Sequence, residues 1–237
     1  ATSYQYRPEY PKKYRTAESD SWSYQIPSED DVSDYQASVD ANFRFTCKVP
    51  RMITLTHERK KDKEGKLIPN KDFLSPKLFN SFISVIDPLL PQIDAVMFEF
   101  EYLNKKKMSS LSTFIHVFGD FIKKLPKDLP YSVETRNSNY LKPEYFSFLR
   151  DENLIHVFSE KQYMPPVYKV YETFGEYIDG DSVIRLLGGD RKEMEEKAKG
   201  EWNEILEPKE DLPAIIDLID ALSEKGRVTV NVNNHYE

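Results

Sequence analysis

Short runs of β-branched and aromatic residues alternate along the chain with longer segments in which apolar residues recur at helical spacing. The strand-like runs are 43–49, 93–100, 131–137, 154–158, 182–189 and 228–235, and 19–25 is a plausible seventh. Such alternation is typical of βαβ units, in which consecutive strands lie parallel in one sheet.

The segments between these strands predict amphipathic helices. They are 75–90, 109–125, 143–153, 167–178, 191–206 and 212–226. In the first helix, Ser75 is a candidate N-cap and Pro76 takes the first helical position, while Gly226 stands where the last helix would have its C-cap. The pattern contains no linker or internal break, so we predict a single domain over residues 1–237. One parallel barrel fits better than a doubly wound sheet, because many of the strands end in polar residues.

Side chains that are two positions apart on a strand share a face, so Glu134 and Arg136 are neighbours. Applied to every strand, this rule collects polar residues on one face and apolar residues on the other. The polar sets are Asp20, Trp22 and Tyr24; Thr46 and Lys48; Met97 and Glu99; Glu134 and Arg136; Arg185; and Asn233 and His235. Because helices cover the outside of a parallel barrel, we expect these sets to face its axis, near the carboxyl-terminal rim where barrel enzymes place catalytic groups.

Composition narrows the class of partner. The formal net charge is −7, and the basic residues are mixed with acids, as in ERKKDKEGK (58–66), which makes a nucleic-acid-binding surface unlikely. No apolar run approaches the roughly 20 residues needed to span a bilayer. With one cysteine, Cys47, and no signal-peptide pattern, we expect a cytoplasmic protein that binds a small polar or anionic ligand.

Neither G-x-G-x-x-G nor G-x-x-x-x-G-K-[ST] occurs in the chain, so the dinucleotide-binding and P-loop classes lack their phosphate-binding backbone. There is also no H-x-H, H-E-x-x-H or Cys/His cluster, and we therefore predict no cofactor and no metal. A mixed oxygen and nitrogen metal site built from His57, Glu99, Glu134 and His235 would have to be assembled by the fold.

Six segments carry a family resemblance, in this chain order: ESDSWSYQIPSEDDV, FRFTCKVPRMITLTH, IDAVMFEF, YSVETRN, SVIRLLGGDR and VNVNNHYE. Together they resemble the YecE-like family, domain of unknown function 72, across essentially the whole chain. The resemblance implies a TIM-type (β/α)8 barrel whose first strand, first helix and last helix are incomplete in this chain. It implies no particular reaction.

Two positions depart from the pattern of that family. The family often has E-x-N-S-T-F-Y where this chain has ESDSWSY, with Asp20 and Trp22 in place of Asn and Thr. It also often has glutamine where this chain has Glu99. An acid at either position changes the charge of the pocket, so a substrate shared with the family does not follow.

Lys48, Arg136 and Arg185 are three cations that we expect to converge on one rim. The planar guanidinium of arginine suits carboxylate or phosphate groups, which indicates an anionic ligand. The alternative is that each cation pairs with Glu18, Asp20, Glu99 or Glu134 in a buried structural network.

Glu134 or Glu99 would carry the proton in acid/base chemistry. If ITLTH (53–57) and VNVNNH (230–235) are strand ends, His57 and His235 take rim positions and are further catalytic candidates. Asn137, Asn233 and Asn234 would orient the ligand. Trp22 and Tyr24 either stack on the ligand or fill the barrel.

We therefore predict a barrel enzyme that hydrolyses or isomerises a small polar anionic substrate. The alternatives are a non-catalytic ligand-binding or interaction protein and a metal-dependent phosphoesterase.

Overall fold

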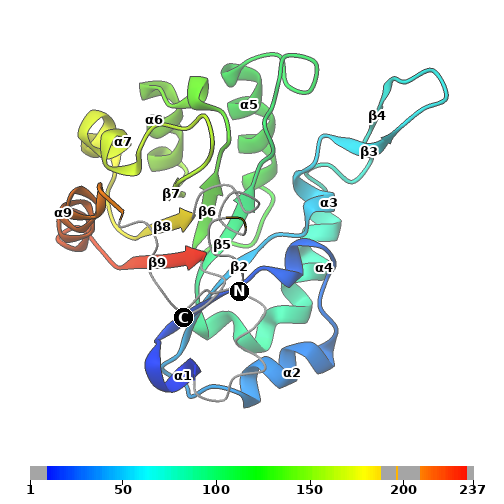
Figure 1. Cartoon of the computed structure of the whole chain (residues 1–237). Helices are drawn as coiled ribbons and strands as arrows, with labels where there is room; N and C mark the ends of the chain where they lie inside the picture. The colour runs from blue at the N-terminus through cyan, green and yellow to red at the C-terminus, as the bar shows by residue number, and fades with distance from the viewer. Residues whose placement is uncertain (1–9, 188–195, 197–208, 234–237) are drawn as a thin grey trace.

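Seven parallel strands form one curved sheet with helices on its outside (Figure 1). The computed structural model describes residues 10–187, 196 and 209–233. In sheet order the strands are β1 (Thr16–Ser19), β2 (Arg44–Lys48), β5 (Ile93–Glu99), β6 (Tyr131–Glu134), β7 (Ile155–Ser159), β8 (Ser182–Leu187) and β9 (Val228–Asn233). A hydrogen bond from Asn231 of β9 to Glu18 of β1, 3.3 Å long, brings the two ends of the sheet together. The fold is a TIM-like barrel, as the sequence predicts.

Helices follow most of the strands and pack on the outer face of the sheet. They are α2 (Glu29–Ala37), α4 (Pro76–Ile86), α5 (Leu111–Ile122), α6 (Pro143–Asp151), α7 (Val167–Phe174) and α9 (Leu212–Ser223), and the short α1 (Tyr10–Lys13) precedes β1. Ser75 caps α4 as predicted, because its side chain accepts a hydrogen bond from the backbone N–H of Leu78. No helix of the described residues is long and apolar enough to cross a bilayer.

The alternation of side chains along each strand separates two cores. Outward-facing residues such as Phe45, Phe98 and Val133 join one apolar core with the helices. Inside the barrel, Ala95, Met97, Val157 and Val183 form a second, smaller apolar group. The charged residues of the inner face come after this apolar group along the same strands. They therefore gather at the carboxyl-terminal end of the barrel.

Two local predictions from the sequence are wrong. The run at 19–25 is not a strand: β1 ends at Ser19, and the 3-10 helix η2 (Ser21–Ser23) follows it. The segment that ends at His57 is not a barrel strand either. Its first part is the short helix α3 (Arg51–Thr54), and His57 begins an antiparallel hairpin of β3 (His57–Lys61) and β4 (Leu67–Pro69), which extends away from the barrel (Figure 1). The helix predicted at 191–206 lies outside the described residues apart from position 196.

His156 of β7 faces outward and is enclosed by aromatic rings. Its ring centroid lies 5.9 Å from that of Tyr145, 5.0 Å from that of Phe146 and 4.7 Å from that of Phe158. Burial lowers the pKa of His156 to about 3, so the imidazole is neutral in the folded protein at physiological pH.

We predict that His156 makes the protein less stable in mild acid. A histidine in the unfolded chain has a pKa of about 6.5. Between about pH 6.5 and pH 3 the unfolded state therefore binds a proton at this position and the folded state does not. As the pH falls through this range, the free energy of unfolding decreases. His156→Phe keeps the aromatic packing and removes this effect. Between about pH 6 and pH 4, the free energy of unfolding of the wild type should fall more steeply than that of His156→Phe, by up to ~1.4 kcal/mol per pH unit. Denaturant unfolding at several pH values measures both slopes, and parallel curves would contradict the prediction.

Candidate functional site

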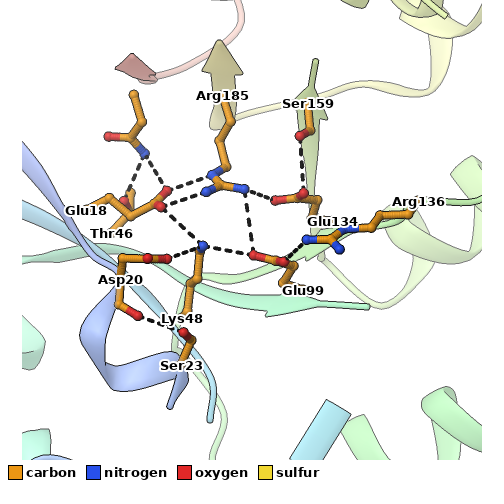
Figure 2. Close-up of polar contacts among 11 residues, drawn as sticks. Glu18, Asp20, Ser23, Thr46, Lys48, Glu99, Glu134, Arg136, Ser159 and Arg185 are labelled. Carbon is orange, nitrogen blue, oxygen red and sulfur yellow. Dashed lines mark hydrogen bonds and ion pairs between the residues drawn. The ribbon is translucent and has the colours of Figure 1, made fainter. Parts of the chain in front are cut away.

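Charged side chains from five strands meet inside the barrel at the carboxyl-terminal end (Figure 2). We call this group the charge cluster, and its members are Glu18, Asp20, Lys48, Glu99, Glu134, Arg136 and Arg185. The strand register explains the convergence, because Glu99 of β5 lies directly opposite Glu134 of β6. Two carboxylates side by side repel each other unless cations lie between them.

Arg185 of β8 supplies the central cation. Its Nε and one terminal nitrogen donate to the two carboxylate oxygens of Glu18, each at 2.7 Å, and its other terminal nitrogen donates to Glu134. The same nitrogen lies 3.8 Å from Glu99. Burial acts to lower the pKa of Arg185, but the charges of Glu134, Glu18 and Glu99 outweigh it and raise the pKa further above its ordinary value. The guanidinium is therefore permanently charged, and it donates three hydrogen bonds to buried carboxylates.

Lys48 of β2 is held in the same way. Its ammonium nitrogen lies 2.9 Å from an oxygen of Glu99 and 3.5 Å from one of Glu18, and it donates a hydrogen bond to Asp20. Burial and the charge of Arg185 act to lower the pKa of Lys48, whereas the three carboxylates raise it, and the carboxylates prevail. Lys48 thus stays protonated between its acidic neighbours.

Glu99 is ionised under all physiological conditions. Burial acts to raise its pKa, but Lys48, Arg136 and Arg185 outweigh burial and lower the pKa to about 2. A carboxylate with so low a pKa is a weak base, and its neutral form is scarce near neutral pH. Glu99 is therefore better suited to holding cations in place than to transferring a proton.

Neutral side chains complete the hydrogen bonding of the buried acids. Ser159 of β7 donates to Glu134 at 3.1 Å, and the amide of Asn231 donates to Thr46 at 2.9 Å as well as to Glu18. Glu134 has no exposed surface, so both its charge and its polar oxygens have to be satisfied within the cluster.

Two cations at the mouth of the cluster are less fully paired. Arg136, which follows β6, donates from one terminal nitrogen to Glu99, but its buried Nε has no hydrogen-bond partner among the described residues. Its side chain is 36% exposed. Lys161, just after β7, is half-buried and forms no ion pair in the described part of the chain. Burial first, and then Arg185 and Arg136, lower the pKa of Lys161 against the opposing charges of Glu134 and Glu99.

The structure brings together six of the residues that the sequence singled out: Asp20, Lys48, Glu99, Glu134, Arg136 and Arg185. Their pairing follows the alternative in which each cation contacts an acid in a buried network. Sequence reasoning named Glu18 only as an ion-pair partner, and it missed Ser159, Asn231 and Lys161. The alternation of β7 and β9 could have identified Ser159 and Asn231, whereas Lys161 lies in a loop without periodicity.

Four other predicted residues lie apart from the cluster. Trp22 is 2% exposed and packs against Tyr35 with ring centroids 5.3 Å apart, so it belongs to the outer core. The common face predicted for Asp20, Trp22 and Tyr24 is therefore wrong, because the chain has left the strand at these positions. Tyr24 is 65% exposed and lies under the guanidinium of Arg51.

His57 and Asn137 have local partners. The Nδ1 of His57 lies 2.9 Å from the hydroxyl oxygen of Thr56. Asn137 is buried and joins two loops, since it accepts from the N–H of Leu103 at 2.8 Å and donates to its carbonyl at 3.0 Å. Asn233 ends β9, but its side chain, like Asn234 and His235, lies outside the described residues.

The carboxylates of the charge cluster contact cations rather than one another. Within residues 10–187 and 209–233, no group of three or more His, Cys, Asp or Glu side chains has an arrangement that could hold a metal ion.

Comparison with known proteins gives a family and a fold. A family model described as "Protein of unknown function DUF72" matches residues 3–237. The crystal structure of a DUF72 family protein from Enterococcus faecalis V583 is 19% identical, with a TM-score of 0.61 over 100% of this chain and 89% of that one. A DUF72 family protein from Thermotoga maritima MSB8 is 17% identical, with a TM-score of 0.61 over 99% of this chain and 82% of that one. The search of curated proteins found no match.

We predict that Arg185 and Arg136 differ sharply in their contribution to stability. Arg185→Ala leaves Glu18 and Glu134 buried without their main cation and should lower the free energy of unfolding by about 3–5 kcal/mol. Arg136→Ala should cost less than about 1 kcal/mol, because Arg136 is partly exposed and Glu99 keeps its contact with Lys48. Denaturant unfolding of both variants tests this, and equal losses would show that the cluster does not depend on Arg185 as described.

Proposed function

We propose that this chain, which belongs to the DUF72 family, is an enzyme that binds a small polar anion at the carboxyl-terminal end of its barrel. The reaction is acid/base chemistry, either isomerisation or hydrolysis. The observation that carries the proposal is the unequal pairing of the cations, because Lys48 and Arg185 are occupied by acids while Arg136 and Lys161 have capacity left.

Arg136 is the anchor for the anion. One terminal nitrogen is fixed by Glu99, and the side chain is 36% exposed, so it stays accessible at the mouth of the cluster. The guanidinium can therefore meet a carboxylate or a phosphate through a pair of parallel hydrogen bonds.

Lys161 is the group that transfers the proton. The lowered pKa of this lysine increases the fraction of neutral amine near physiological pH, and only the neutral amine can accept a proton. In an isomerisation, Lys161 takes a proton from the substrate and returns it to a different atom. In a hydrolysis, it takes a proton from the attacking water and gives it to the leaving group.

The deep carboxylates support these two residues. Glu99 fixes the position of Arg136, and Glu134 is held between Arg185 and Ser159. This assignment replaces Glu99 as a proton carrier, because the pKa of about 2 leaves it ionised. Glu134 has no exposed surface, so its role is to hold Arg185 in place.

A non-catalytic ligand-binding protein is the second candidate. The observation in its favour is the completeness of the buried pairing, since the acids nearest the barrel axis are all engaged by Lys48 and Arg185. In that case the charge cluster supports the barrel, and the mouth binds its anion without changing it.

We expect inorganic phosphate to bind at this mouth and to stabilise the protein. At ten times its dissociation constant, phosphate should raise the free energy of unfolding by ~1.4 kcal/mol relative to chloride at equal ionic strength. Arg136→Ala should abolish this stabilisation, and Lys161→Met should reduce it. Thermal unfolding measures the difference, and isothermal titration gives the affinity.

Lys127→Met is the matched control, because Lys127 is an exposed lysine in the loop before β6, at the opposite end of the barrel. It should bind phosphate as tightly as the wild type does. Binding that Arg136→Ala leaves intact would refute the proposed site. Turnover of small anionic esters or sugar phosphates that Lys161→Met removes, while phosphate still binds, would separate the enzyme from the non-catalytic alternative.

A further inference from the structure

A cavity of about 380 Å³ lies at the opposite, amino-terminal end of the barrel. It is bounded by α6, by the start of β7 and by the segment that leads into β8, and its apolar walls include Phe146, Leu149 and Ile178. Small-molecule sites commonly have volumes of about 300–1,000 Å³, with apolar walls and a few polar groups. This cavity therefore has the volume of a ligand site, and its lining residues include no member of the charge cluster.

The wall before β8 is fixed by contacts with the end of α9. Lys225 donates to the carbonyls of Gly175 and Ile178 at 2.7 and 2.8 Å, and the backbone N–H of Arg227 donates to Asp181 at 2.9 Å. Gly226 lies so close to Gly180 that a side chain there would meet backbone atoms at 2.4 Å. The cavity is thus held open by a rigid wall, which lowers the cost of ordering a bound molecule.

His156 is the buried polar group of this cavity. Its Nδ1 is enclosed and has no hydrogen-bond partner among the described residues, and burial keeps the ring neutral with a pKa of about 3. An orphaned buried N–H is rarer than an orphaned acceptor, which favours placing the single proton on Nε2. The Nε2–H is then the donor that can meet a hydrogen-bond acceptor of a bound molecule.

The rim of the cavity is acidic. Asp179 is exposed and has no partner among the described residues, and Asp181 lies two positions further along the chain. Arg150, the cation of the rim, already lies 3.9 Å from Asp151 and over the ring of Tyr177. A positive group at the rim would therefore meet the unpaired carboxylate of Asp179.

We propose that this cavity binds a small molecule with an apolar ring, a hydrogen-bond acceptor at its inner end and a cationic amino group at the rim. The ring contacts Tyr177 and Ile178, the acceptor meets Nε2 of His156, and the amino group lies near Asp179. This second site is independent of the anion site at the other end of the barrel.

Tyramine is a suitable probe, because it carries a phenol, an aromatic ring and an amine in this order. Phenethylamine lacks the hydroxyl group, and phloretate carries a carboxylate in place of the amine. Isothermal titration should show saturable binding of tyramine, binding of phenethylamine that is about two- to tenfold weaker, and no binding of phloretate. Asp179→Asn should weaken tyramine about two- to fivefold, and Glu144→Gln, which changes an exposed acid of α6 outside the cavity, should have no effect.

The affinities of both amines for His156→Phe, compared with those for the wild type, isolate the hydrogen bond between His156 and the phenol hydroxyl group. Loss of the hydrogen bond should weaken tyramine about two- to tenfold while leaving phenethylamine unchanged, so that the two amines bind this variant about equally. The proposal is overturned if tyramine does not bind saturably, if phloretate binds as tightly as tyramine, or if Asp179→Asn and His156→Phe both leave tyramine binding unchanged. Since Asp179 is exposed, its variant keeps the test decisive even if His156→Phe does not fold.

Discussion

The burial of the Arg185 guanidinium between Glu18 and Glu134 is the interaction on which both the barrel and its site depend. β1 and β9 stand at the two ends of the strand order, and in the described part of the chain no backbone ladder joins them. Side chains bridge this seam instead, because Arg185 of β8 and Asn231 of β9 both reach Glu18 of β1. In an environment of low dielectric constant, each of these charges is tolerable only while its partners stay in place. The same contacts that close the barrel therefore fix the positions of the acids at its carboxyl-terminal end.

Because of this pairing, the cations deep in the barrel have more acidic partners than those at its mouth. Deep in the barrel, Lys48 and Arg185 are surrounded by carboxylates and cannot turn towards a ligand without leaving buried charge uncompensated. At the mouth, Arg136 has one acidic partner and Lys161 has none in the described residues. In the proposed anion site, a fully paired charged layer therefore lies below two less fully paired cations, an arrangement that favours binding with little rearrangement.

The sequence predicts this layer well wherever a side chain sits within a regular strand. Lys48, Glu99, Glu134 and Arg185 face inward because the period of a strand is two, and this geometry follows from the pattern alone. The same rule fails for Trp22 and Tyr24, because β1 ends at Ser19 and η2 turns the chain towards the outer core. It fails for His57 because a single helical turn and a hairpin interrupt the barrel after β2. The pairing of acids with cations depends on contacts between strands that are far apart in the chain. The alternation of residues within one strand carries no information about those contacts.

β7 links the two ends of the molecule through the same alternation. Its outward-facing His156 borders the amino-terminal cavity, its inward-facing Ser159 donates to Glu134, and Lys161 follows directly at the mouth. A register slip of one residue would exchange the two faces, placing the imidazole of His156 in the inner apolar group and taking the Ser159 hydroxyl away from Glu134. The register of β7 is therefore specified from both sides, by the aromatic enclosure of His156 outside and by the carboxylate of Glu134 inside. A short strand of five residues can in this way fix the residues of both proposed sites at opposite ends of one barrel.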